Sequence, residues 1–295
     1  MGSSQLQGVP VQSLIGDPLI LGYNTNGFAH HRLKDAIRIL AGLGYRALAL
    51  TPDVHHLDVT QSGWETEAKE IAKILDDFGM IRVVETGARF VLDAYWKHRP
   101  NLLEADSKDR LVRRDFLIRC MDLANQIGSP LVSFWSGTPK PEFGPEEVLW
   151  DRLADGCRLL SEEAAQRSLL IGFEPEPGML IETTRAGLDL VAKVAHPVFK
   201  LTLDIGHLQC MGEPLPETLR LGLPNTINIH FEDMRFGIHD HLPPGEGEMD
   251  LVGAMTQIRD SGFPGPVCVE LSRHSHDAVA TARKTFDWFR FNGFA

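Results

Sequence analysis

Cysteine is scarce in this sequence. The four cysteines, Cys120, Cys157, Cys210 and Cys268, form no CxxC pair, and each falls within an apolar run. This pattern excludes a disulfide framework and is typical of reduced, buried thiols. No apolar run approaches the roughly 20 residues of a membrane-spanning helix, and the N-terminus lacks the basic and apolar regions of a secretion signal. We therefore predict a cytoplasmic protein with no membrane partner.

Positively charged residues are also few compared with negatively charged ones. The chain has 29 Lys and Arg against 40 Asp and Glu, for a net charge of -11. Affinity for nucleic acid comes mostly from Lys and Arg that displace counterions from phosphates, so this balance argues against a nucleic-acid partner. Local basic patches remain compatible with it.

No linker or low-complexity tract interrupts the 295 residues. Short β-branched or apolar runs alternate with segments of helical period, and eight such runs read as strands: 18–24, 45–51, 81–87, 130–136, 169–175, 199–205, 226–232 and 266–272. Apolar strands that are each followed by a helix predict a parallel sheet covered by helices. Eight units predict a single (β/α)8 TIM barrel over residues 1–295, with residues 1–16 as a flexible N-terminal extension.

A doubly wound open sheet is the alternative fold. It would carry a glycine-rich dinucleotide loop after the first strand, and the sequence GYNTNG at that point is not GxGxxG. The barrel is therefore the preferred prediction.

Four polar residues stand at the ends of successive predicted strands: Glu174, Asp204, His230 and Glu270. In such barrels the C-terminal strand ends meet at one face, where active sites form. Three carboxylates repel one another unless a cation joins them, and oxygen ligands with one imidazole suit Mn²⁺, Co²⁺, Mg²⁺ or Zn²⁺. A single acid at such a place is often only a helix cap or an ion-pair partner. The quartet together predicts a divalent-metal site.

Other residues near these strand ends are candidates for substrate binding. His207 follows Asp204 by three residues, and the segment after the seventh strand carries an arginine and an HxH pair that would line the rim or hold a second metal. The full set of substrate-binding candidates is His207, Arg235, His239, His241, Glu176 and Trp135. The long aromatic segment 89–106 is a candidate lid or dimer contact, so a homo-oligomer is compatible with the sequence.

The motifs FEPEPG, LTLDIGH, INIHFED, HDHLPPGEGEMDL and VCVELS resemble the xylose isomerase-like superfamily of sugar isomerases and epimerases. This superfamily includes tagatose-epimerase-like enzymes and the apurinic endonucleases. The resemblance implies a TIM barrel in which Glu174, Asp204, His230 and Glu270 bind one divalent metal and the two glutamates exchange protons with the substrate. It also implies that His207 holds a substrate oxygen, with Arg235 an approximate match to an assisting arginine.

The endonuclease branch differs from this chain at several positions. That branch uses additional histidines after strands two and four and an Asp-x-His after strand seven. Here His55 and His56 follow strand two, SFWSG without histidine ends strand four, and His239 and His241 occupy the Asp-x-His position. A three-metal nuclease site is therefore incomplete.

The resemblance and the strand-end residues predict a metal-dependent isomerase or epimerase of a small keto sugar or sugar phosphate, acting through an enediolate. A dehydratase or lyase of a keto sugar or cyclitol is the alternative enzyme. A noncatalytic sugar-binding barrel and an apurinic endonuclease are the remaining hypotheses. The expected partner is a small carbohydrate.

Overall fold

The computed structural model describes residues 19–295, and eight parallel strands in it close into a barrel. The predicted (β/α)8 fold is confirmed, and the open sheet is excluded by the closure. The predicted extension at residues 1–16 lies outside the described residues. The barrel strands are β1 (Ile20–Asn24), β2 (Ala47–Leu50), β3 (Ile81–Glu85), β4 (Leu131–Trp135), β5 (Leu170–Glu174), β6 (Phe199–Asp204), β7 (Thr226–Phe231) and β10 (Pro266–Val269).

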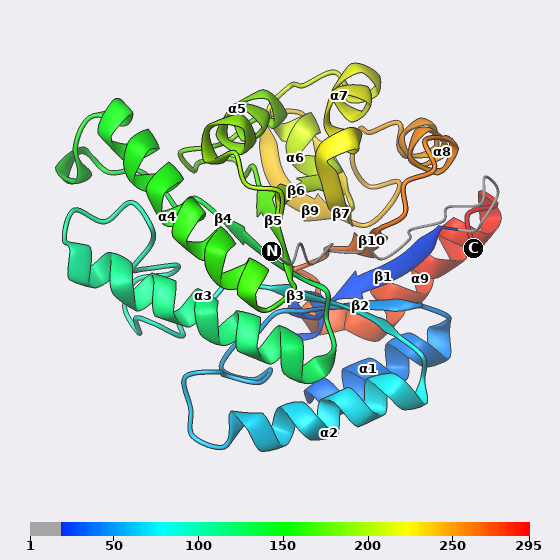
Figure 1. Ribbon diagram of the computed structural model, residues 1–295. Coiled ribbons are helices and arrows are strands. Elements are labelled where there is room, and N and C mark those ends of the chain that lie inside the picture. Colours follow the sequence, from blue (N-terminus) through cyan, green and yellow to red (C-terminus); the bar gives the residue numbers. More distant parts are fainter. Residues whose placement is uncertain (1–18) are drawn as a thin grey trace, which may run out of the picture.

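Helices surround this barrel on its outside (Figure 1). They are α1 (Leu33–Leu43), α2 (Trp64–Asp77), α3 (Ser107–Ile127), α4 (Glu146–Gln166), α5 (Thr184–Val194), α6 (Ile205–Cys210), α7 (Leu215–Gly222), α8 (Leu251–Asp260) and α9 (Ala278–Phe291). Short 3₁₀ turns are η1 (Thr25–Phe28), η2 (Pro141–Phe143), η3 (Leu223–Asn225) and η4 (Ser275–Asp277). No helix among residues 19–295 has the length and apolar character that crossing a bilayer requires.

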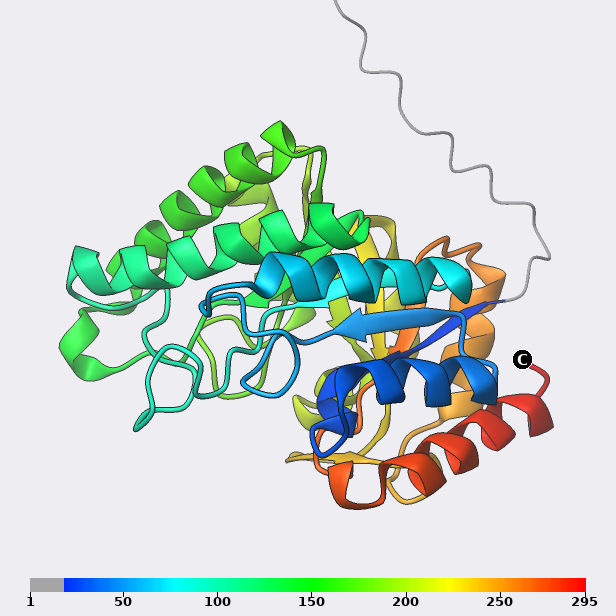
Figure 2. The same ribbon diagram turned by 90° about the horizontal axis from the view of Figure 1, so that it is seen from below.

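Closure of the barrel joins the two ends of the chain. β1 pairs in parallel with β2 on one side and with β10 on the other, where Ile20 stands opposite Pro266. The corresponding helices are neighbours too, and Figure 2 shows α1 beside α9. The order around the barrel is β1-β10-β7-β6-β5-β4-β3-β2.

Helix α1 illustrates how local sequence fixes these elements. Its buried residues, Leu33, Ala36, Ile37 and Leu40, follow the spacing that gives one apolar face. The helix ends at Gly44, whose φ of 112° is unfavourable for other residues and whose N–H bonds back to the carbonyls of the last turn.

Apolar side chains of the barrel strands also pack together on the inside of the barrel, apart from the main core. Ala47, Ala49, Val83, Leu131 and Cys268 form one buried cluster there. Aromatic side chains pack on the outer face instead, against the helices: Phe231 contacts the rings of Trp288 and Phe289. Phe231, the last residue of β7, is therefore a core residue.

Two elements near the C-terminal strand ends were not predicted. Helix α6 begins directly after β6, and an antiparallel hairpin of β8 (Asp233–Arg235) and β9 (Ile238–Leu242) follows β7. Asp233 anchors this hairpin by accepting hydrogen bonds from the backbone N–H groups of Gly245 (2.8 Å) and Met249 (3.1 Å). The hairpin therefore stands in a fixed position beside the strand ends.

Candidate active site

His230, near the end of β7, lies at the centre of a cluster of acidic side chains. Its Nδ1 lies 3.0 Å from Glu174 Oε1 and 2.8 Å from Glu270 Oε2. On the other edge of the ring, Nε2 lies 3.0 Å from Glu85 Oε1 and 3.2 Å from Asn228 Nδ2. The imidazole thus joins carboxylates that come from three different strand ends.

Asp204 completes the cluster, and its two oxygens have different surroundings. Oδ1 caps α6, accepting hydrogen bonds from the backbone N–H of Gly206 (2.7 Å) and of His207 (3.1 Å). Oδ2 is buried and accepts no hydrogen bond from the described residues. The helix-cap interpretation of Asp204 is therefore correct for one oxygen, while the other remains available to a ligand.

These residues fit a divalent cation. One ligand atom each from Glu174, Asp204, His230 and Glu270 lies within 4.8 Å of the others. Three carboxylates carry more charge than the imidazolium of His230 offsets. The buried Oδ2 of Asp204 accepts no hydrogen bond from the described residues, although His207 Nε2 lies 3.4 Å from it. Glu85 on the far edge of the His230 ring matches the carboxylate that usually orients a metal-binding histidine.

Burial and the neighbouring charges shift the pKa values of the clustered side chains. Burial raises the pKa of Glu174 to about 7, although the charge of His230 opposes the shift. Burial alone would also raise the pKa of Glu270, but His230 outweighs it and lowers the pKa well below the usual range. Burial alone would lower the pKa of His230, and the charges of Glu174, Glu85 and Glu270 instead raise it well above the ordinary value. In the metal-free site His230 is therefore an imidazolium held by carboxylates.

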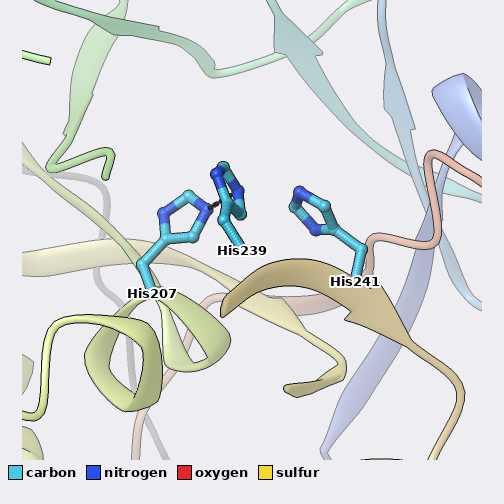
Figure 3. Close-up of side chains that lie close together, drawn as sticks. All are labelled: His207, His239 and His241. Carbon is cyan, nitrogen blue, oxygen red and sulfur yellow. Dashed lines mark hydrogen bonds between the residues drawn. The ribbon is translucent and has the colours of Figure 1, made fainter. Parts of the chain in front are cut away.

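Three histidines lie together beside this cluster (Figure 3). His207 donates from Nδ1 to the Pro175 carbonyl at 3.1 Å, and its Nε2 lies 3.0 Å from His239 Nε2. Burial lowers the pKa of His239 to about 3, whereas nearby carboxylates, led by Asp204, overcome burial and raise the pKa of His207 to about 9. His207 consequently donates the shared hydrogen bond and His239 accepts it.

A cavity of about 380 Å³ opens above the cluster. Of the residues predicted to bind substrate, Trp135, Glu176, His239 and His241 line it. Removal from water raises the pKa of Glu176 to about 8.

Two predicted substrate-binding residues lie elsewhere. His207 stands behind His239 and is not part of the lining. Arg235 is turned away: its Nε pairs with Asp240 Oδ2 at 2.6 Å, its side chain is 49% exposed, and it lines no part of the cavity. The structure therefore does not bring Arg235 to the cavity, because an aspartate within the hairpin holds its guanidinium.

The sequence of this chain matches a known protein family over most of its length. A family model described as xylose isomerase-like TIM barrel matches residues 29–291. The chain belongs to this family. The family assignment made from the motifs at the strand ends is confirmed.

Two relatives of this chain have been described as enzymes. L-Ribulose-5-phosphate 3-epimerase UlaE of Shigella flexneri serotype 5b is 22% identical over 258 residues, which are 87% of this chain and 88% of that protein. 3-Dehydroshikimate dehydratase of Pseudomonas putida is 29% identical over 197 residues, which are 63% of this chain but only 30% of the dehydratase. The chain thus corresponds to a minor part of that longer protein.

Solved structures in the xylose isomerase-like TIM barrel family share the fold. The apo crystal structure of 3-keto-D-glucoside 4-epimerase, YcjR, from E. coli superposes with a TM-score of 0.76 at 14% identity, over 92% of this chain and 99% of that chain. At this identity the likeness concerns the fold alone.

Sequence reasoning missed three polar residues of the site. Glu85 ends β3 and contacts His230, Asn228 on β7 donates to Glu85 Oε1 at 2.9 Å, and Asn26 in η1 donates to Glu270 Oε1 at 2.7 Å. Glu85 carries the same signal as the predicted ligands, an acid at the end of a strand. Asn228 and Asn26 carry no comparable signal, because an amide within a strand or turn is common.

The histidines considered for a nuclease-type site are placed differently. The Nε2 of His56 lies 2.9 Å from the carbonyl of His31, and neither His55 nor His56 lines the cavity. Strand β4 ends in Trp135, which cannot bind a metal through its indole. Neither the segment after β2 nor the end of β4 therefore supplies a histidine to the cavity.

Proposed function

We propose that this protein is a divalent-metal-dependent epimerase or isomerase of a small keto sugar or sugar phosphate. The observation that carries the proposal is the pair of carboxylates on His230 Nδ1, Glu174 at 3.0 Å and Glu270 at 2.8 Å. These carboxylates come from β5 and from the residue after β10, which are separated in the barrel by β6 and β7. They therefore approach the site from two sides.

Glu174, Asp204, His230 and Glu270 would hold the cation. When bound, a divalent ion supplies Lewis acidity that favours loss of a proton from the carbon next to a carbonyl. Asp204 would contribute Oδ2, since its Oδ1 is occupied by the cap of α6. His230 would contribute Nδ1, with Glu85 holding the Nε2–H on the opposite edge.

Glu174 and Glu270 are also placed to move protons. A substrate in the cavity would meet one carboxylate on each side, so that one removes a proton and the other returns a proton to the opposite face, which inverts the carbon. Return of the proton to the neighbouring carbon would give isomerisation instead. Trp135, Phe134 and Met179 line the same cavity and reduce the access of water.

A dehydratase is the second candidate. It is favoured by the 29% identity to 3-dehydroshikimate dehydratase, although that match covers only 30% of the longer enzyme. The same two carboxylates would serve it: one removes the proton next to the carbonyl, and a hydroxyl on the adjacent carbon leaves with a proton as water. The two candidates share the first proton transfer and differ only in the second step, which is return of a proton in one and loss of water in the other.

Solvent deuterium exchange tests the proposal. We expect Mn²⁺-loaded protein incubated in D₂O with a panel of ketoses and ketose phosphates to place deuterium on the carbon next to the carbonyl, without loss of water, as followed by NMR. Loss of water from a cyclic keto acid or keto sugar would favour the dehydratase. Absence of exchange from every ketose, ketose phosphate and keto acid supplied would contradict both and leave a binding barrel.

His207→Ala should raise KM about fivefold, because His239 on the cavity wall loses a hydrogen bond that stabilises by roughly 1 kcal/mol. Metal binding should remain at one ion per chain, since the cap that orients Asp204 comes from the backbone N–H of residue 207. Steady-state kinetics and metal analysis measure the two effects. A variant that loses its stoichiometric metal would show that His207 is a ligand instead.

A cytoplasmic location and the absence of a nucleic-acid partner complete the proposal. Among the described residues the four cysteines are free, and Cys120, Cys157 and Cys268 are buried, which suits a reducing compartment. The net charge of -11 gives little affinity for a phosphate backbone. We also propose that the segment 89–106 serves as a lid or as a contact between two copies of the chain.

A further inference from the structure

The outer part of the cavity carries positive charge, in contrast to its acidic floor. Arg89, Lys97 and Arg273 line the same space as Glu174 and Glu270. Lys97 and Arg273 are exposed and Arg89 is half-buried, whereas Glu174 at the floor is buried. Three positive side chains around one opening contrast with the net charge of -11 of the whole chain.

These cations come from two distant parts of the chain. Arg89 and Lys97 belong to the segment between β3 and α3, and Arg273 follows β10. Partial burial lowers the pKa of Lys97, the charges of Arg89 and Arg273 lower it further, and the charge of Glu176 opposes them. The three cations therefore feel one another's charge. Their repulsion would be relieved by an anion lying among them.

The protein itself supplies little of that relief. Among residues 19–295 no carboxylate lies within 4.0 Å of the amino group of Lys97 or the guanidinium of Arg273. Arg89 Nη1 lies 3.7 Å from Asp53 Oδ2, a long separation, and Arg273 donates to the carbonyl of His239. Hydrogen-bonding capacity therefore remains on all three side chains.

Balancing the charge of the acidic floor does not explain the three cations. The carboxylates there contact His230, His207 and Asn26 rather than any Arg or Lys. A cation placed to neutralise the floor would approach it within ion-pair distance, since the stabilisation falls as the charges separate. The positive residues are more exposed than the carboxylates of the floor, and they line the same cavity toward its opening.

We propose that Arg89, Lys97 and Arg273 form a subsite that binds a carboxylate or phosphate group on the substrate, at the end remote from the reacting carbons. The proposal rests on the function proposed above and narrows the substrate class from neutral keto sugars to anionic ones. Two guanidinium groups and one ammonium group suit both anions, because arginine offers paired donors and lysine a compact charge.

Binding of unreactive analogues tests the subsite directly. The matched probes are ribitol, ribonate and ribitol 5-phosphate, titrated by calorimetry into Mn²⁺-loaded and metal-free protein at low salt. We expect an anionic probe to bind at least about tenfold more tightly than ribitol, with an affinity that falls as salt is added. The tighter of the two anions identifies the group as carboxylate or phosphate.

The variants Lys97→Gln and Arg273→Gln should each weaken binding of the preferred anion about tenfold, the order of one charge-assisted hydrogen bond, in both metal states. An equal loss of affinity with and without Mn²⁺ would show that the anion binds these side chains and not the metal. Lys140→Gln is the matched control, because Lys140, which follows β4, stands over the ring of Trp96 beside Lys97 and lines no part of this cavity. Its affinity for the anion should be that of the wild type.

Equal affinity for ribitol and both anions, or unchanged anion affinity in both variants, would overturn the subsite. Two further results distinguish failure of the subsite from failure of the proposed function. Anion binding that depends on Lys97 and Arg273 in a protein that exchanges no substrate proton would uphold the subsite and refute the enzyme. Proton exchange on a ketose phosphate at the same rate in wild type and both variants, at a substrate concentration well below saturation, would uphold the enzyme and refute the subsite.

Discussion

Glu174→Gln and Glu270→Gln should each reduce turnover by at least about 10²-fold, the order expected when a positioned acid or base is removed. Each amide keeps the shape of the carboxylate but cannot accept the substrate proton. The 3.0 and 2.8 Å contacts to His230 Nδ1 would also change, so metal binding weakens in both variants. Deuterium exchange measured with metal restored to saturation isolates the proton-transfer defect.

Glu162→Gln is the control for that experiment. Glu162 lies exposed on α4, outside the cavity, and its substitution removes the same charge from the same type of side chain. Its exchange rate should equal that of the wild type. If Glu174→Gln and Glu270→Gln also exchanged at the wild-type rate, the scheme with two carboxylates would be refuted.

Removal of the metal should abolish activity, and Mn²⁺, Co²⁺ or Mg²⁺ should restore it. Without a cation the surplus negative charge of Glu174, Asp204 and Glu270 is offset only in part by His230, and no Lewis acid promotes loss of the proton. Chelation followed by re-addition of each ion, with turnover measured at every step, tests this. Full turnover by a sample shown to be metal-free would refute it.

The barrel itself should survive chelation. Its apolar core extends over all eight strands and the surrounding helices, and most of it does not depend on the four candidate ligands. A cation that binds only the folded state adds about 2.7 kcal/mol at a hundred times its Kd, which raises the melting temperature without creating the fold. Circular dichroism should therefore show a folded metal-free protein that melts at a lower temperature.

The fold could be predicted because both of its signals are local. Each strand is a short apolar run and each helix a periodic one, and the eight predicted strands match the barrel strands with small differences at their ends. The cluster at Glu174, Asp204 and His230 could be predicted for the same reason, since parallel strands place their final residues at one face.

Residues fixed by loops were less predictable. Arg235 was assigned to the substrate, but its partner Asp240 lies across the turn of a hairpin that the sequence did not reveal. Arg89, Lys97 and Arg273 carry no periodic signal, and their convergence depends on how two loops fold over the same opening. Glu85 is a different case, because the rule that selected the other acids applied to it equally.

The pairing of β1 with β10 also has a consequence for how the protein folds. The hydrogen bond from Asn26 to Glu270 spans 244 residues and that between Glu85 and His230 spans 145, so both require contacts between distant parts of the chain. Such contacts form slowly, because the long intervening chain must first be ordered. A partly folded chain that lacks β10 lacks Glu270 and Arg273 as well. Glu270 therefore reaches His230 and Asn26 only when the last strand has joined the barrel.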